Sequence, residues 1–111
     1  MKTSELNKLP ELEPMQTEYE DKEIKNGYTS DLLSDVMANA GENALLITIQ
    51  AHKNTIAVAS LLDCAGVIIC NNKDLPEDML ASAKQEKIAV FRTKLNQFSA
   101  SHLVYTQLHR A

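Results

Sequence analysis

Near the middle of the chain stands Leu45-Leu-Ile-Thr-Ile-Gln-Ala-His-Lys-Asn-Thr-Ile-Ala-Val-Ala-Ser60. Residues 45–49 are apolar except for Thr48 and show no alternation, which is typical of a strand that is covered on both faces of a parallel sheet. A short polar turn follows, and then a predicted helix at 55–63 whose small residues allow close approach to the sheet. We expect any ligand at this turn, because ligands of open α/β sheets bind at the carboxyl ends of strands.

Strands and helices continue to alternate toward the C-terminus. Buried strands are predicted at 66–70 and 88–91, with a helix that opens at Pro76 between them, and a last helix runs from about 96 to 108. Connections of this kind are crossovers in a parallel sheet. The predicted fold class is therefore α/β, a small, mostly parallel sheet with flanking helices. The last helix is expected to bury four side chains, Phe98, Leu103, Val104 and Leu108.

The first part of the chain is less regular. Residues 1–14 contain two prolines and are predicted to form an arm or a short helix ahead of one domain at 15–111. Residues 15–20 alternate in polarity, as a half-exposed strand does. The pair Asn26-Gly27 indicates a tight turn. A helix is expected to begin directly after it, capped by Thr29 or Ser30.

Composition restricts the class of protein. The chain has 111 residues, enough for a single domain, and its net charge of −4 comes without a Lys/Arg cluster, which argues against nucleic-acid binding. We find no apolar run of about 18 residues and no signal peptide, so no membrane association is expected and the protein is predicted to be cytoplasmic. Cys64 and Cys70 lack the spacing of a redox or zinc motif and are expected to be free, buried thiols.

Two segments carry a resemblance to a known family. They are Tyr28-Thr-Ser-Asp-Leu-Leu-Ser-Asp-Val-Met37 and Leu46-Ile-Thr-Ile-Gln-Ala-His-Lys-Asn-Thr-Ile-Ala-Val-Ala59. Both resemble the small stand-alone members of the DRTGG-domain family, and the likeness continues at 66–69 and 88–93, covering roughly residues 23–105. The resemblance implies a fold like the N-terminal domain of HPr kinase/phosphorylase.

The resemblance also implies a regulatory context. Family relatives occur as accessory domains of phosphotransacetylases and beside nucleotide-sensing domains, and stand-alone members are associated with hydrogenase gene clusters. This chain departs from the family in one respect. It lacks the Asp-Arg-Thr-Gly-Gly run that names the family and carries Gln50-Ala-His-Lys-Asn54 at the turn after the central strand.

The turn at 50–55 is the predicted site. Free backbone N–H groups and the helix dipole favour an anion there, and Lys53 adds positive charge. Asp31 and Asp35 lie four apart on the predicted preceding helix, where they would bind a cation or steer a ligand, or simply complement the helix dipole. In a plainer alternative, Asn54 only caps the helix and His52 satisfies a carbonyl group. The predicted ligand-binding residues are Tyr28, Ser30, Asp31, Gln50, His52, Asn54, Thr55 and Thr93.

Signatures of catalysis are absent. With three glycines, the chain contains neither a Gly-x-Gly-x-x-Gly motif nor a phosphate-binding loop, and it lacks the Gly-x-Ser-x-Gly and His-Glu-x-x-His motifs. We therefore expect a non-catalytic module, without catalytic residues, metal ligands or a cofactor. It would sense a small anionic, phosphate-bearing metabolite or bind a partner protein, and the family resemblance links it to hydrogenase or energy metabolism.

Two other functions stay open, a small metal-dependent enzyme at the Gln50/His52/Asp31 rim and an oligomeric assembly adaptor. A homo-oligomer, as a dimer, is expected in any case. The reason is that the predicted helix at 55–63 is apolar almost all round, and a helix of that kind is covered on more than one side. Closed two-fold assembly is the commonest way for a small domain to hide such a surface.

Overall fold

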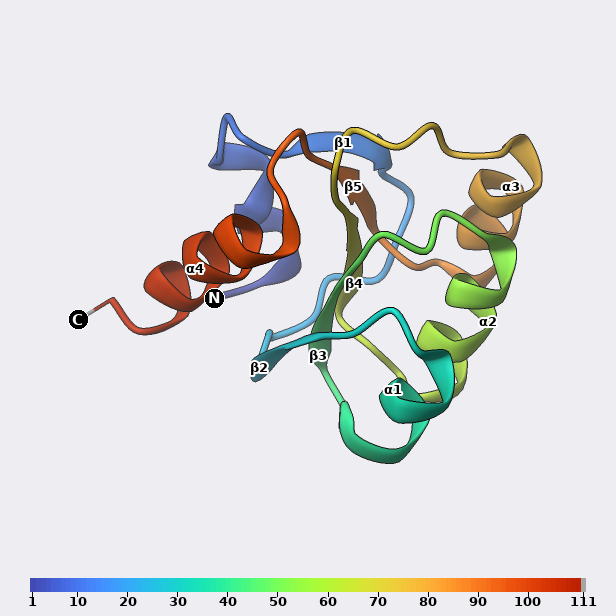
Figure 1. The fold of residues 1–111 in the computed structure, drawn as a ribbon, viewed down its shortest axis with the longest axis horizontal. Helices are drawn as coiled ribbons and strands as arrows, with labels where there is room; N and C mark the ends of the chain where they lie inside the picture. Colours follow the sequence, from blue (N-terminus) through green and yellow to red (C-terminus); the bar gives the residue numbers. More distant parts are fainter. Residues whose placement is uncertain (111) are drawn as a thin grey trace.

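Residues 1–110 are described by a computed structural model (Figure 1). One sheet of five strands forms in the order β1-β5-β4-β3-β2. Every neighbouring pair is parallel except β1 with β5. The strands are β1 (Glu13–Gln16), β2 (Asn26–Thr29), β3 (Ala44–Thr48), β4 (Gly66–Ile69) and β5 (Val90–Arg92).

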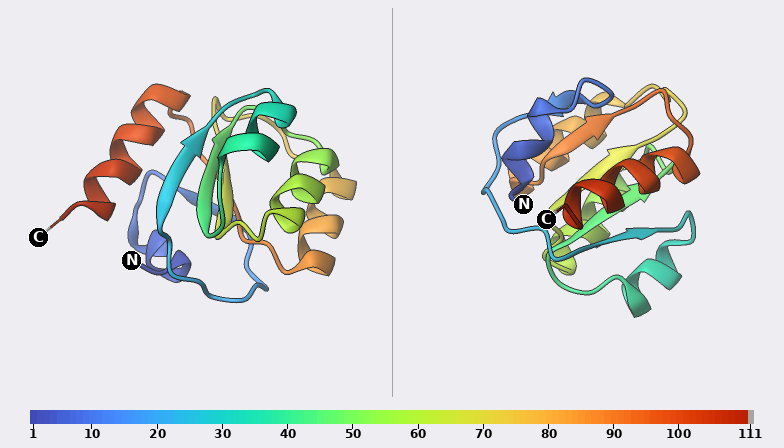
Figure 2. Two further views of the ribbon diagram at one scale, coloured as in Figure 1. Left: turned by 90° about the horizontal axis from the view of Figure 1, so that it is seen from below. Right: turned by 90° about the vertical axis from the view of Figure 1, so that its left-hand side faces the viewer.

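Helices cover both faces of the sheet (Figure 2). Three lie on one face, α1 (Leu33–Asn39), α2 (Lys53–Leu61) and α3 (Glu77–Glu86). On the other face lie α4 (Gln97–Leu108) and the N-terminal 3-10 helix η1 (Thr3–Lys8). The predicted α/β class, with a small and mostly parallel sheet between helices, is confirmed.

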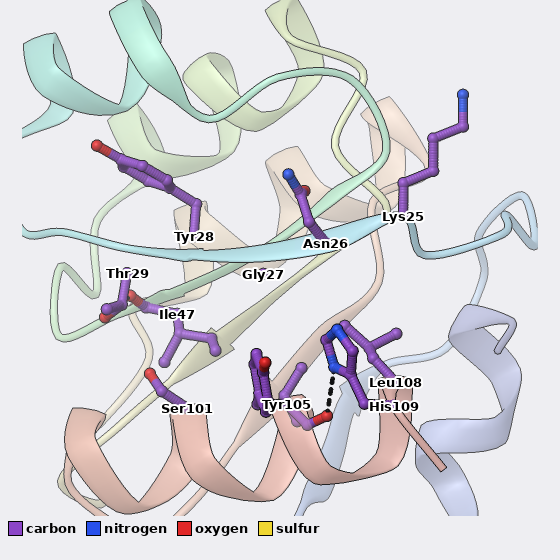
Figure 3. Close-up of a pocket in the computed structure, with 11 residues that line it drawn as sticks. Lys25, Asn26, Gly27, Tyr28, Thr29, Ile47, Ser101, Tyr105, Leu108 and His109 are labelled. Atoms are coloured by element: carbon purple, nitrogen blue, oxygen red, sulfur yellow. Dashed lines mark hydrogen bonds between the residues drawn. The ribbon is translucent and has the colours of Figure 1, made fainter. Parts of the chain in front are cut away.

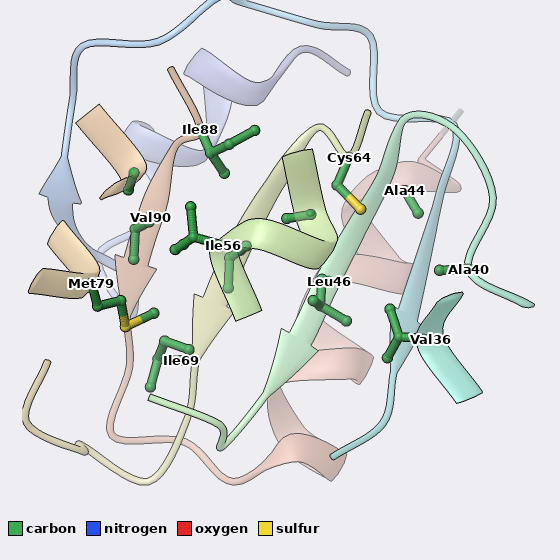
Figure 4. Packing of buried hydrophobic residues seen from close by; sticks show 13 residues of the cluster. Val36, Ala40, Ala44, Leu46, Ile56, Cys64, Ile69, Met79, Ile88 and Val90 are labelled. Carbon is green, nitrogen blue, oxygen red and sulfur yellow. The ribbon is translucent and has the colours of Figure 1, made fainter. Parts of the chain in front are cut away.

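The central strands explain the apolar runs of the sequence. All five residues of β3 and all four of β4 are buried, and their side chains alternate between two cores. On the face of α1–α3, Leu46 and Ile69 pack with Ile56 of α2 and Met79 of α3 (Figure 4). Burial of one such side chain contributes about 1.5–3 kcal/mol to the free energy of folding, so the two cores on the two faces of the sheet supply most of the driving force.

The second core lies on the face of α4. It contains Ile47 and Phe91 of the sheet, Val104 of α4, and Leu6 and Leu12 from the first residues of the chain. Residues 1–14 therefore do not hang free but contribute to the packed interior.

Both cysteines are free and buried, as expected. Burial raises the pKa of the Cys64 and Cys70 thiols to about 11. The thiols are therefore protonated, and weak nucleophiles, at neutral pH.

The structure corrects the sequence-based prediction in the first half. Asn26-Gly27 is not a turn but the start of β2, which pairs in parallel with Ala44 to Ile47. A Cβ at position 27 would make ordinary van der Waals contact with Val104 Cγ1 at 3.6 Å, so the strand does not require a glycine there. The strand predicted at 15–20 is also displaced, since β1 covers Glu13–Gln16 and ends where the alternation was expected to continue.

Two helix predictions need correction as well. The first helix begins at Leu33 and has Leu32 as its N-cap without a side-chain hydrogen bond, so neither Thr29 nor Ser30 caps it. Phe98, expected in the core, is 86% exposed. The reason is the rotation of α4, which turns Ala100 and Val104 to the sheet and leaves Phe98 outside.

Within residues 1–110, no helix has the length and apolar composition that a membrane crossing requires.

Candidate functional site

The carboxyl ends of four parallel strands meet at one edge of the sheet, called the rim below. The loop after β2 holds Ser30 and Asp31, the loop after β3 holds residues 50–52, and Thr93 directly follows β5. The loop after β2 is adjacent to the loop after β3, whereas the end of β5 is separated from the end of β3 by β4.

Asp31 is engaged within the protein. Its Oδ1 accepts hydrogen bonds from Thr48 Oγ1 at 3.0 Å and from the Ile49 N–H at 3.1 Å. The side-chain amide of Gln97, in the first turn of α4, lies 3.1–3.2 Å from the same carboxylate and donates to it when its nitrogen faces Asp31. Asp31 thus ties the loop after β2 to the end of β3 and to α4. It is a structural anchor at the rim.

Tyr28 lies on the side of the sheet that α1 covers. Its hydroxyl donates to Asp35 Oδ2 at 2.8 Å. This hydrogen bond lowers the pKa of Asp35 and raises the pKa of Tyr28. Asp31 precedes α1, so the two carboxylates do not share a helix face as the sequence suggested.

Ser30 makes a local turn. Its Oγ accepts from the Leu32 N–H at 3.2 Å, which bends the chain between β2 and α1.

The turn after β3 is capped by an imidazole. His52 is the N-cap of α2, and its Nδ1 accepts from the Asn54 N–H at 3.0 Å. In the neutral ring the proton then sits on Nε2, on an exposed side chain. The cap is therefore His52 and not Asn54, and both side chains keep donors that face solvent.

Thr55 and Gln50 behave differently from each other. Thr55 is fully buried, and its Oγ1 donates to the Gln50 carbonyl at 2.7 Å, which closes the turn. The Gln50 side chain is exposed. Of the predicted residues at this turn, Gln50, His52 and Asn54 are thus available to a ligand, and Thr55 shapes the backbone.

Thr93 is buried, and its hydroxyl group makes two hydrogen bonds. Its Oγ1 donates to the Glu11 carbonyl at 2.8 Å and accepts from the Leu95 N–H at 3.2 Å. It lies beside a hollow of about 320 Å³ lined by Pro10, Glu11, Glu13, Asn72, Arg92, Thr93, Lys94 and Leu95. This hollow opens at the end of β5, away from the loop after β3.

Sequence reasoning missed two of three lysines at the rim. Lys53, Lys73 and Lys94 follow β3, β4 and β5, and all three are exposed. They are far apart in the sequence, but each stands within five residues of the end of a predicted parallel strand. That common position was the signal that they would gather at one edge.

A second feature is a groove between β2 and α4 (Figure 3). It has a volume of about 370 Å³. Its walls are the strand on one side and, on the other, Ser101, Val104, Tyr105, Leu108 and His109 of α4. The Tyr105 and His109 rings stack with centroids 4.0 Å apart. Nothing in the sequence-based prediction indicated this groove, because β2 itself was not recognised.

Among residues 1–110, no three His, Cys, Asp or Glu side chains gather so that they could hold a metal ion.

Comparison with known proteins bears on the fold. No protein-family model matches the chain, and no curated protein matches it in sequence. The structure is similar to that of the CBS and DRTGG domains of the regulatory region of a Clostridium perfringens pyrophosphatase, solved in complex with its activator, diadenosine tetraphosphate. The TM-score is 0.69 and the sequence identity 17%.

The match covers 89% of this chain and 43% of the pyrophosphatase chain, so this chain spans less than half of its neighbour. The likeness supports a DRTGG-like fold, in agreement with the resemblance in sequence.

Proposed function

We propose that the protein is a non-catalytic regulatory domain that binds a small phosphate-bearing metabolite at the rim. The carrying observation is the set of exposed donors around the N-terminus of α2, His52, Lys53 and Asn54. Exposed Lys73 adds positive charge on the adjacent loop after β4, and Lys94 follows β5, one strand farther along the sheet. Ammonium, imidazole and amide groups are hydrogen-bond donors suited to phosphate oxygens. The first turn of a helix adds a favourable dipole.

The likeness to the regulatory region of the pyrophosphatase supports the regulatory part of this proposal. That neighbour was solved with an adenine nucleotide as activator. The side chains of Asp31, Thr55 and Thr93 make hydrogen bonds within the protein. In this proposal they do not contact the ligand but hold the loops that present the donors. The family resemblance links the module to hydrogenase or energy metabolism.

The proposal is tested by thermal shift against diadenosine tetraphosphate, ATP, AMP, pyrophosphate and inorganic phosphate. A ligand that binds only the folded state raises Tm, by an amount that grows with its concentration above Kd. Stabilisation by all phosphate compounds would indicate that the anion is recognised. Stabilisation by the nucleotides alone would indicate a base-specific site, and no shift with any of them would overturn the proposal.

Calorimetry with the stabilising compound then locates the site. His52→Ala and Asn54→Ala are each expected to weaken binding about tenfold, because a charge-assisted hydrogen bond contributes roughly 1.5–3 kcal/mol. Lys87→Ala is the matched control, since Lys87 is exposed at the far end of α3. If both rim variants bind as tightly as wild type while folded, the rim is not the site.

A further inference from the structure

The outer side of β2 offers unpaired backbone groups. β2 is the last strand of the sheet on its side. The Lys25 N–H donates inward to the Asn43 carbonyl at 3.0 Å. Backbone groups alternate in direction along a strand, so those of Gly27 and Thr29 also face β3, and those of Asn26 and Tyr28 face outward. Among the described residues, none pairs with this outer side of β2.

Exposed apolar side chains flank the same edge on both faces of the sheet. On α4, Phe98 is 86% and Tyr105 64% exposed. On the opposite face, α1 lies at this edge, and Leu32 and Met37 are also exposed (Figure 2). Among the large exposed hydrophobic residues of the described chain, Leu61 of α2 alone lies away from this edge. Clustered exposed apolar groups around an open strand are typical of a protein interface.

One polar atom inside the groove lacks a partner. Ser101 Oγ is enclosed between β2 and α4, and it makes no hydrogen bond within the described residues. Ser101 also lines the shallower hollow that continues along α4 past Phe98 and His102. Buried hydroxyl groups are normally hydrogen-bonded, so Ser101 Oγ is an unsatisfied polar atom on this side of β2.

The charges at the two ends of the edge are opposite. Lys25 stands at the start of β2, and the exposed Arg110 follows α4 at the same end of the groove. Asp31 and Asp35 follow the other end of the strand. A second copy turned by a two-fold axis would therefore place its acidic end beside the basic end of the first. A parallel copy would place like charges together and would not close.

We propose that this edge is where a second copy of the chain docks, β2 against β2 in antiparallel orientation, to give one continuous sheet. Asn26 stands opposite Tyr28 of the second copy, and each such pair exchanges its backbone hydrogen bonds around Gly27 at the axis. The exposed faces of the two α4 helices, with Phe98 and Tyr105, cover the new strand pair. The proposal does not depend on ligand binding at the rim.

The test is the mass in solution by light scattering and analytical ultracentrifugation. Wild type is expected to be a dimer at about 100 μM, as contacts of about 800 Å² per partner allow. Asn26→Pro removes one outward N–H and, at an edge, no hydrogen bond within the chain. It is expected to weaken dimerisation about tenfold or more, and Asn26→Ala, which keeps the N–H, is expected to remain a dimer.

A second pair of variants tests the exposed apolar side chains beside β2. Their result does not depend on whether Asn26→Pro folds. Phe98→Glu changes a side chain that is already in solvent, so it should fold and yet dimerise at least about tenfold more weakly. Leu61→Glu is the matched control, because Leu61 is 70% exposed on α2 and lies outside the proposed interface.

A monomer for wild type at about 100 μM would overturn the proposal. So would a dimer that Leu61→Glu breaks and that Asn26→Pro and Phe98→Glu leave intact, which would place the interface on α2.

Discussion

The two edges of the sheet differ in how they are closed to other chains. β1 is interrupted by Pro14, which has no N–H to offer, and its register with β5 shifts between Pro14 and Gln16. Its Glu13 carboxylate accepts from Arg92 Nε and Nη2 at 3.0 and 2.9 Å, which puts charge on this edge. Proline, irregular register and charge are the devices by which proteins block edge strands. β2 has an uncharged Asn-Gly-Tyr-Thr sequence and none of these devices.

The two edges of the sheet therefore have different tasks. The β1 side is fixed from within, since Leu6 and Leu12 hold the N-terminal residues in the core below Phe91. At the β2 edge, the large side chains of Phe98 and Tyr105 are exposed to solvent. Stability should therefore depend on the first edge, and assembly on the second.

The largest expected effect sharpens this contrast. Leu6 is fully buried, and Leu6→Ala should lower the free energy of unfolding by about 3 kcal/mol, through lost burial and the cavity left behind. Tyr105→Ala, at the other edge, should change the stability of the folded chain by less than about 0.5 kcal/mol, because its side chain is exposed. Urea denaturation at one low protein concentration measures both. Equal losses for the two variants would contradict the division of tasks.

A smaller effect is expected where β1 ends. Gln16 is buried, and its Nε2 donates to the Ile88 carbonyl at 2.8 Å while its Oε1 accepts from the Glu18 N–H at 2.7 Å. Gln16→Ala leaves these backbone groups unpaired and should cost about 1–3 kcal/mol. Thr17→Ala, at the exposed neighbour, is the control and should cost little. A loss no greater than that of the control would show that water replaces the amide and that β1 is not held here.

The smallest effect concerns pH at the β2 edge. The Tyr28 hydroxyl holds the pKa of Asp35 below its ordinary value of 3.8. A lowered pKa in the folded state means that the stabilisation is present above pH 3.8 and is lost as the pH falls through the folded-state pKa. Wild type should thus lose Tm on acidification more steeply than Asp35→Asn, measured between pH 6 and about pH 2. Tyr28→Phe should flatten the profile in the same direction, and three parallel profiles would disprove this link.

The sequence alone determined the elements whose pattern is local. The apolar runs of β3 and β4 are buried on both faces, as the absence of alternation and the short length of these runs indicated. Pro76 ahead of acidic residues marked the start of α3 in the same way. Placing Gln50, His52 and Asn54 at the carboxyl end of β3 followed directly from these elements.

Features that depend on contacts between residues distant in the sequence became visible in the folded chain alone. Asn26-Gly27 has the composition of a turn, and it becomes a strand because Ala44 to Ile47 offer it a ladder. Packing of Ala100 and Val104 against the sheet decides which side of α4 faces solvent. The pattern of apolar residues along α4 did not predict that orientation. Asp31 is likewise held by hydrogen bonds from Thr48, the last residue of β3, and from Ile49, which directly follows that strand. In each case the free energy comes from a contact between segments, and a single segment read by itself does not contain it.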